Sequence, residues 1–232
     1  MAFEHFLAMT WAEIEEASTL PASLAWMACR FSQDGPGLCD LPEALPAGSL
    51  LMLNDQLPFR DNDPQAILEQ LRGTLERFSC RGLVVDFQRP EEAAQARLAE
   101  LLYRRLPCPV CVTPEYAPSG CPVLLPPIAA YEAPETVLAP WNGREIWLET
   151  GLARAQIQLT PQGAAYSDWQ GRTSLPFYDA RLCCHYGIRI DQEQVRFFLA
   201  RQAEDQKRLL KRLEGLGVHL GIGLYQEFSA QT

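Results

Sequence analysis

A carboxylate and an amide close one short apolar run in this chain. Residues 81–90 form a stretch that Gly82 opens, with Asp86 and Gln88 near its end. The apolar, mostly β-branched residues before Asp86 favour a buried strand, along which Val84, Asp86 and Gln88 share one face. Since α/β proteins place ligand sites at the carboxyl ends of such strands, we expect the carboxyl group of Asp86 and the amide of Gln88 to lie at a ligand site.

Three glutamates stand at or just beyond the ends of other expected strands, namely Glu115, Glu149 and Glu227. In a barrel of parallel strands all carboxyl ends meet at one face, so each glutamate is a candidate catalytic partner of Asp86. The competing interpretation is a solvated loop acid for each glutamate. For Asp86 it is a buried acid that the backbone or an arginine satisfies.

Strand and helix patterns alternate through the first half of the chain. Strands are expected at residues 24–31, 49–55, 82–88, 110–113, 145–149, 155–160, 182–190, 194–199 and 218–225, and a short apolar run stands at 123–125. Helices are expected at residues 3–17, 64–78, 90–105 and 201–216. Asp63 and Pro64 supply a cap and a first turn for the second of these helices. Residues 33–48, 114–140 and 161–180 are expected to be loops, and 191–193 a hairpin turn.

This alternation indicates parallel strands joined by right-handed crossovers. Roughly eight strands, with few helices in the central part, predict an α/β fold: a degenerate (β/α)8 TIM-like barrel with helices missing in the middle. The alternative is an open α/β sheet. A chain of 232 residues is long enough for one such domain, covering residues 1–232.

Charge and hydropathy narrow the range of partners. The net charge is −9 and no basic run is present, so neither nucleic acid nor an anionic membrane surface is expected as a partner. No apolar run reaches the ~20 residues that span a bilayer. The first basic residue is Arg30, so no secretory signal is expected and the prediction is a soluble, cytoplasmic protein. Nothing in the sequence sets the oligomeric state.

Cysteine spacing gives no metal site. The eight cysteines are expected to be reduced in a chain without a signal peptide. Cys108 and Cys111 have the spacing of zinc ligands, but no second pair follows, so neither a metal nor a cofactor is expected. His185, next to Cys184, leaves open a cysteine–histidine nucleophile against the commoner packed histidine.

Residues 79–90 resemble the strand-four signature of the family-18 glycoside hydrolases, the chitinase-like barrels, which is written DGxDxDxE. Gly82 takes the place of the glycine, Asp86 that of the last aspartate and Gln88 that of the proton-donating glutamate. Residues 194–225 are similar to the last β-α-β unit of those barrels. The resemblance implies a barrel that cleaves amino-sugar polymers: the substrate's own acetamido group attacks, the aspartate orients it and the glutamate protonates the leaving oxygen.

The sequence departs from this pattern where the chemistry needs an acid. Gln88 can hydrogen bond to a sugar hydroxyl but cannot donate a proton to a leaving group, and Arg81 and Val84 replace the other two aspartates. One hypothesis is a divergent glycoside hydrolase in which another carboxyl, about 5–9 Å from Asp86, supplies the proton. The other is a non-catalytic module, binding carbohydrate or a protein partner, that kept the barrel and lost the acid.

Polar and aromatic side chains at the expected strand ends are candidates for holding a sugar. They are Gln88, Asn54, Asp55, Tyr225, Gln226 and Trp147. Amides and carboxylates hydrogen bond to hydroxyl groups, and aromatic rings stack on sugar rings. A carbohydrate is therefore the expected ligand of the hydrolase and of the carbohydrate-binding form of the module.

Overall fold

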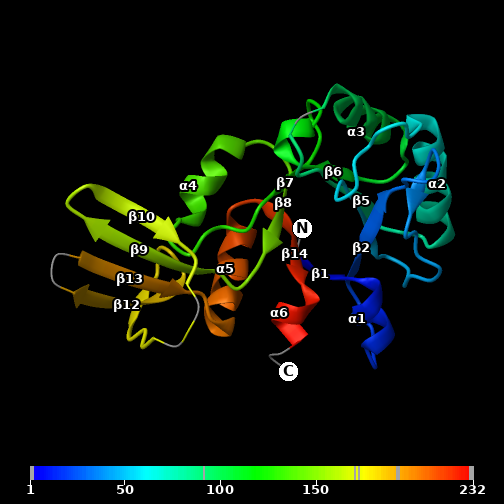
Figure 1. Cartoon of the computed structure of the whole chain (residues 1–232). Helices are drawn as coiled ribbons and strands as arrows, with labels where there is room; N and C mark the ends of the chain where they lie inside the picture. The colour runs from blue at the N-terminus through cyan, green and yellow to red at the C-terminus, as the bar shows by residue number, and fades with distance from the viewer. Residues whose placement is uncertain (1–2, 91, 170, 172, 192–193, 230–232) are drawn as a thin grey trace.

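Eight parallel strands close into a barrel in the computed structural model, which describes residues 3–90, 92–169, 171, 173–191 and 194–229 (Figure 1). Around the barrel they are β1 (Glu4–Met9), β2 (Leu24–Phe31), β4 (Leu50–Asn54), β5 (Gly82–Asp86), β6 (Val110–Val112), β7 (Val123–Leu125), β8 (Ile146–Thr150) and β14 (Val218–Leu224). The barrel closes because β1 pairs with both β2 and β14. The expected TIM-like barrel is confirmed, and the open sheet is excluded.

The connections between these strands are unequal. The long crossover helices are α2 (Pro64–Arg77), α3 (Ala93–Arg105) and α5 (Ala203–Gly215). The shorter elements are α1 (Trp11–Glu16), α4 (Pro134–Leu138), α6 (Tyr225–Ser229), the 3-10 helices Pro114–Tyr116 and Ala139–Trp141, and β3 (Leu38–Cys39), which pairs with β2. No full helix joins β6 to β7 among the described residues, as expected for a barrel with helices missing in the middle.

Helix α2 begins where its sequence signal predicts. Asp63 accepts a hydrogen bond from the backbone N–H of Gln65 at 3.0 Å, and Pro64 occupies the first turn. The buried face of the helix packs on the outside of the barrel and consists of Ile67, Leu68, Leu71 and Leu75.

Alternation along the strands divides their side chains between the inside and the outside of the barrel. The inner core contains Phe6, Ala8, Ala25, Leu50, Met52, Val84, Cys111, Leu124, Trp147, Leu220 and Ile222. Asp86 stands two residues after Val84, so it lies on the inner face at the carboxyl end of β5. Asn54 and Glu149 take the same position on β4 and β8, because each stands two residues after a member of the inner core.

A second, antiparallel sheet is inserted between β8 and α5 and lies beside the barrel in Figure 1. Its strands are β9 (Arg154–Thr160), β10 (Gly163–Ser167), β11 (Phe177–Asp179), β12 (Cys184–Asp191) and β13 (Gln194–Ala200), in the order β10-β9-β13-β12-β11. The β12–β13 hairpin was expected, and its turn at residues 192–193 lies outside the described residues. One domain over residues 1–232 remains a prediction.

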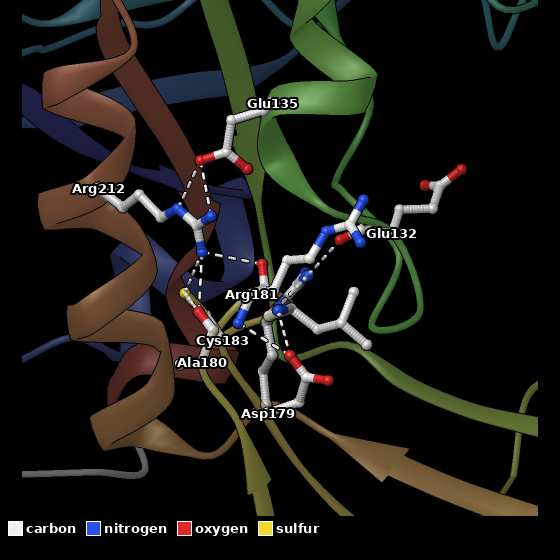
Figure 2. Close-up of polar contacts among 9 residues, drawn as sticks. Glu132, Glu135, Asp179, Ala180, Arg181, Cys183 and Arg212 are labelled. Carbon is white, nitrogen blue, oxygen red and sulfur yellow. Dashed lines mark hydrogen bonds and ion pairs between the residues drawn. The ribbon is translucent and has the colours of Figure 1, made fainter.

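Arg212 on α5 joins the second sheet to the barrel (Figure 2). Its guanidinium donates hydrogen bonds to Oε1 of Glu135 on α4 at 2.7 Å and to the carbonyl oxygens of Ala180 and Arg181 at 2.8 Å each. Ala180 and Arg181 lie in the connection between β11 and β12. One side chain thus holds a barrel crossover and the sheet in contact with the same helix.

Two expectations for secondary structure are wrong. Residues 3–17 are not one helix: β1 fills the closing position of the barrel, and α1 begins only at Trp11, after a capping box between Thr10 and Glu13. Residues 161–180 are not only loop, because they contain β10 and β11. Every residue of β10 is exposed, so this strand has no apolar alternation and its pairing with β9 defines it.

Two smaller differences from the expected secondary structure remain. A short helix, α4, lies within the expected loop 114–140. The last strand ends at Leu224, one residue earlier than expected, and Tyr225 begins α6. Among the described residues, no helix has the length and apolar character needed to cross a membrane.

Candidate functional site

A cavity of about 490 Å³ opens at the carboxyl ends of the barrel strands. Its lining includes Ala8, Met27, Met52, Asn54, Asp55, Gln56, Asp86, Gln88, Arg89, Pro127, Glu149, Thr150, Gly151, Ile222, Gly223, Leu224 and Glu227. The volume lies within the range of small-molecule sites, and the lining combines an apolar floor with converging carboxylates and amides. Six expected site residues come together here: Asn54, Asp55, Asp86, Gln88, Glu149 and Glu227.

Asp86 lies at the end of β5 with its carboxyl group partly buried. The side-chain amide of Gln88 donates a hydrogen bond to its Oδ1 atom. Burial raises the pKa of Asp86, the neighbouring negative charge of Asp55 raises it further, and the hydrogen bond from Gln88 opposes both effects. Asp86 is therefore a cavity-lining acid with a raised pKa, and one of its oxygens accepts a hydrogen bond from Gln88.

Glu149 reaches the same cavity from β8. Burial, followed by the negative charge of Asp86, raises its pKa to about 7. Near neutral pH a large share of Glu149 therefore carries a proton. Two interacting carboxyls from different strands, one of them a proton donor at neutral pH, are the components that acid-catalysed cleavage of a glycosidic bond requires.

Asp55 holds the loop that carries Gln88. Its carboxylate accepts hydrogen bonds from the backbone N–H groups of Gln88 and Arg89 at 2.9 Å each, and from Nε2 of Gln95 at 3.1 Å. Arg89 returns a hydrogen bond from Nε to the carbonyl oxygen of Asp55 at 2.7 Å. With only 3% of its surface exposed, Asp55 fixes the shape of the loop after β5.

Asn54 supports an irregularity in β2. The register between β2 and β4 shifts, so that Met27 and Ala28 stand opposite one residue, Met52. Asn54 Nδ2 donates a hydrogen bond to the carbonyl oxygen of Met27 at 2.9 Å, and Asn54 Oδ1 accepts one from the N–H of Gln56 at 3.2 Å. The bulge directs Met27 into the cavity, and the side chain of Asn54 provides a hydrogen-bond donor for the backbone carbonyl of Met27.

Glu227 closes the cavity from the C-terminal side. Its Oε2 atom accepts a hydrogen bond from the backbone N–H of Leu152 at 2.8 Å. A β-carbon at Gly151 would lie 3.1 Å from this oxygen, so a glycine there gives the carboxylate room. Glu227 thus connects the segment after β14 with the segment after β8.

Four expected site residues lie elsewhere. Glu115 is exposed on the 3-10 helix Pro114–Tyr116, and Gln226 is exposed and Tyr225 half-buried on α6. Trp147 is 3% exposed in the inner core of the barrel, where its Nε1 donates to Glu145 Oε1 at 2.9 Å. None of the four belongs to the described lining of the cavity.

Thr150 is a lining residue that the sequence did not indicate. A hydrogen bond of 2.8 Å joins the Oγ1 atom of Thr150 to Nε2 of His5, and both side chains lie close to Gly221. A β-carbon at Gly221 would lie 3.0 Å from the His5 ring and 3.2 Å from the Thr150 methyl group. The sequence hides this pairing because residues 3–17 have the pattern of a helix, whereas His5 lies on β1, next to β14.

Comparisons with known proteins identify the barrel by structure alone. No protein-family model and no curated protein matches the sequence. The spore cortex-lytic enzyme SleL of Bacillus cereus matches with a TM-score of 0.54 and 12% identity, over 96% of this chain and 70% of that chain. SleL of Bacillus megaterium QM B1551 matches with a TM-score of 0.53, at the same identity and coverage.

A family-18 chitinase from Cycas revoluta, in complex with (GlcNAc)4, has a TM-score of 0.52 and 11% identity, over 96% of this chain and 94% of that chain. At these identities the likeness shows a shared fold. The chain thus shares its barrel fold with these proteins.

Proposed function

We propose that the cavity binds a glycan that contains amino sugars, and that Glu149 is the proton donor of a divergent glycoside hydrolase. The observation that carries this proposal is the Asp86–Glu149 pair in one cavity, with the pKa of Glu149 at about 7. The barrel is shared with a chitinase whose complex contains (GlcNAc)4, which supports a sugar as ligand.

In this mechanism the acetamido oxygen of the substrate attacks the anomeric carbon while Glu149 protonates the leaving oxygen. Asp86 orients the acetamido group and stabilises the charge that develops on it. Water then opens the cyclic intermediate and gives a proton to the carboxylate of Glu149, which restores the acid. Gln88 hydrogen bonds to Asp86 and has no proton to give. The acid is thereby supplied from β8, across the cavity, instead of from the end of β5.

A non-catalytic carbohydrate-binding module is the second candidate. The observation that favours it is the amide of Gln88, which stands where the resembled family has its acid and occupies one oxygen of Asp86. A cavity of this kind would retain its ligand contacts without cleaving the bond.

Turnover of chito-oligosaccharides and peptidoglycan fragments separates the two candidates. Glu149→Gln and Asp86→Asn are each expected to lower the rate by roughly 100-fold or more, because removal of a general acid or of an orienting carboxylate costs that much. Glu115→Gln is the matched control, since Glu115 is exposed outside the cavity. Binding without turnover in the wild type would favour the module, and absence of both would contradict the proposal.

A further inference from the structure

One side of the second sheet is apolar across all of its strands. Residues that pair across antiparallel strands point to the same side of a sheet, as do residues two apart along one strand. Ile188 therefore shares its side with Phe197, Ile157 and Tyr166, which lie in line with it on β13, β9 and β10. The exposed large side chains on this side, which we call the apolar face, are Leu159, Tyr166, Phe177, Ile188 and Ile190.

Burial on this side of the sheet ends about halfway along the strands. At the end next to the barrel, Cys184 and Leu199 form a buried cluster with Ala130 from the segment after β7. Farther along β12 the exposed fraction rises to 46% at Ile188 and 71% at Ile190. The barrel thus covers the inner half of this side, and the apolar face is the half that extends beyond it.

The opposite side of the sheet has its own cover. The ring of Trp169 meets that of Phe198 on β13 edge to face, with centroids 5.5 Å apart, and its Nε1 donates to the carbonyl oxygen of Leu199 at 3.0 Å. A β-carbon at Gly187 would overlap the carbonyl oxygen of Ser174, so the segment between β10 and β11 lies directly against β12. The apolar face therefore differs from the rest of the sheet in being both apolar and exposed.

We propose that the apolar face is the interface of a homodimer, in which the second sheets of two copies stack face to face. This inference goes beyond the proposed function and does not depend on it. The five side chains expose roughly 600 Å² per copy, so two copies would bury about 1,200 Å², the lower limit for stable specific interfaces. A patch of that size lies at the upper end of those found on monomers.

The charge of this side favours a second copy over other occupants. Asp179, a charged strand residue on this side, lies at the barrel end, where its Oδ1 accepts hydrogen bonds from the N–H groups of Arg181 and Leu182. A twofold axis through the uncharged apolar face brings no like charges together, and stacked sheets bury such faces about 10 Å apart. An anionic membrane would instead meet a chain of net charge −9.

Sedimentation equilibrium of the full chain tests the inference. We expect a mass of twice 26.0 kDa at concentrations above about 10 μM, because an interface near the lower size limit binds in the micromolar range. Ile188→Lys should raise the dissociation constant at least ~100-fold, since each dimer would then bury two unpaired ammonium groups. Ile190→Lys should act in the same way, and its high exposure leaves folding of the single chain unaffected.

Ala165→Lys is the matched control, because Ala165 is exposed on β10 next to Tyr166 but points to the opposite side. It should dimerise as the wild type does. A wild type that stays monomeric up to about 100 μM overturns the inference. A dimer that both isoleucine variants leave intact overturns it too, because the contact would then lie on another surface. Binding of the wild-type monomer to anionic vesicles would replace the second copy by a membrane.

The outcome is separable from that of the proposed function. No residue of the apolar face belongs to the described lining of the cavity at the strand ends. Ile188→Lys should therefore bind and turn over chito-oligosaccharides as the wild type does, within twofold. Loss of dimerisation with unchanged turnover supports the inference, whereas equal turnover with an unchanged dimer contradicts it and leaves the proposed function standing.

Discussion

Glu149 holds a proton in a pH range where an exposed glutamate has lost it. Its pKa is about 7 instead of 4.5 because its carboxyl is buried and lies near Asp86. Between these two pH values the folded chain binds more protons than the unfolded chain, so the free energy of unfolding falls as the pH rises. Below pH 4.5 both states are protonated, and above pH 7 the loss is complete, at most ~3 kcal/mol.

Glu149→Gln should remove this dependence, because glutamine stays neutral at every pH. Urea denaturation at pH 4 and pH 8 is expected to show similar stability for the two proteins at the lower pH. At the higher pH the variant should be more stable, by up to ~3 kcal/mol. A difference that does not change with pH would contradict the raised pKa of Glu149.

Part of the residue-level picture follows from the sequence. Alternation along the strand from Gly82 predicts the inner face on which Val84 and Asp86 lie. The expected barrel makes Glu149 one of three candidate partners of Asp86, but the sequence does not single it out, because β5 and β8 meet across a barrel whose closure depends on pairing far along the chain. Nor does it show that Asp55 is saturated by N–H donors, since these belong to a loop whose shape only the folded chain defines.

At the scale of elements, the loop between β5 and α3 depends on Asp55. Asp55→Ala removes the acceptor for two backbone N–H groups and for Gln95, and we expect a loss of about 3 kcal/mol in the free energy of unfolding. Ligand binding should fall too, because Gln88 loses its support. Asp61→Ala, in the exposed loop after β4, should change stability by less than about 0.5 kcal/mol. Equal effects of the two variants on urea unfolding would show that the loop keeps its shape without Asp55.

Which elements the sequence reveals depends on where their stabilisation comes from. Helix α2 carries its own signals in Asp63, Pro64 and a periodic apolar face. Strand β1 is only six residues long and runs directly into the capping box at Thr10, so its pattern merges with that of a helix. Strand β10 has no buried residue at all. Pairing with neighbouring strands defines both: β1 pairs with β14 and β2, and β10 pairs with β9.

At the scale of the whole molecule, the barrel and the inserted sheet meet around a buried arginine. Arg201, at the end of β13, is 3% exposed, and burial lowers its pKa. It donates hydrogen bonds to the carbonyl oxygens of Ala129 at 2.9 Å, of Leu182 at 3.1 Å and of Ile128. Ile128 and Ala129 belong to the segment after β7, and Leu182 precedes β12. The hydrogen bonds of Arg201 therefore join a barrel connection to the second sheet.

Arg201→Met keeps an apolar stem but removes the guanidinium, and so removes the donor that Arg201 supplies to the carbonyl oxygens of Ile128 and Leu182, each at a cost of about 1–3 kcal/mol. We expect the melting temperature to fall by at least about 10 °C, with the second sheet losing protection from amide hydrogen exchange before the barrel does. Arg189→Met, which alters an exposed arginine on β12, should leave both measurements unchanged. Simultaneous loss of protection in barrel and sheet would mean that the two unfold as one cooperative unit, the single domain expected for residues 1–232, and that Arg201 stabilises them equally.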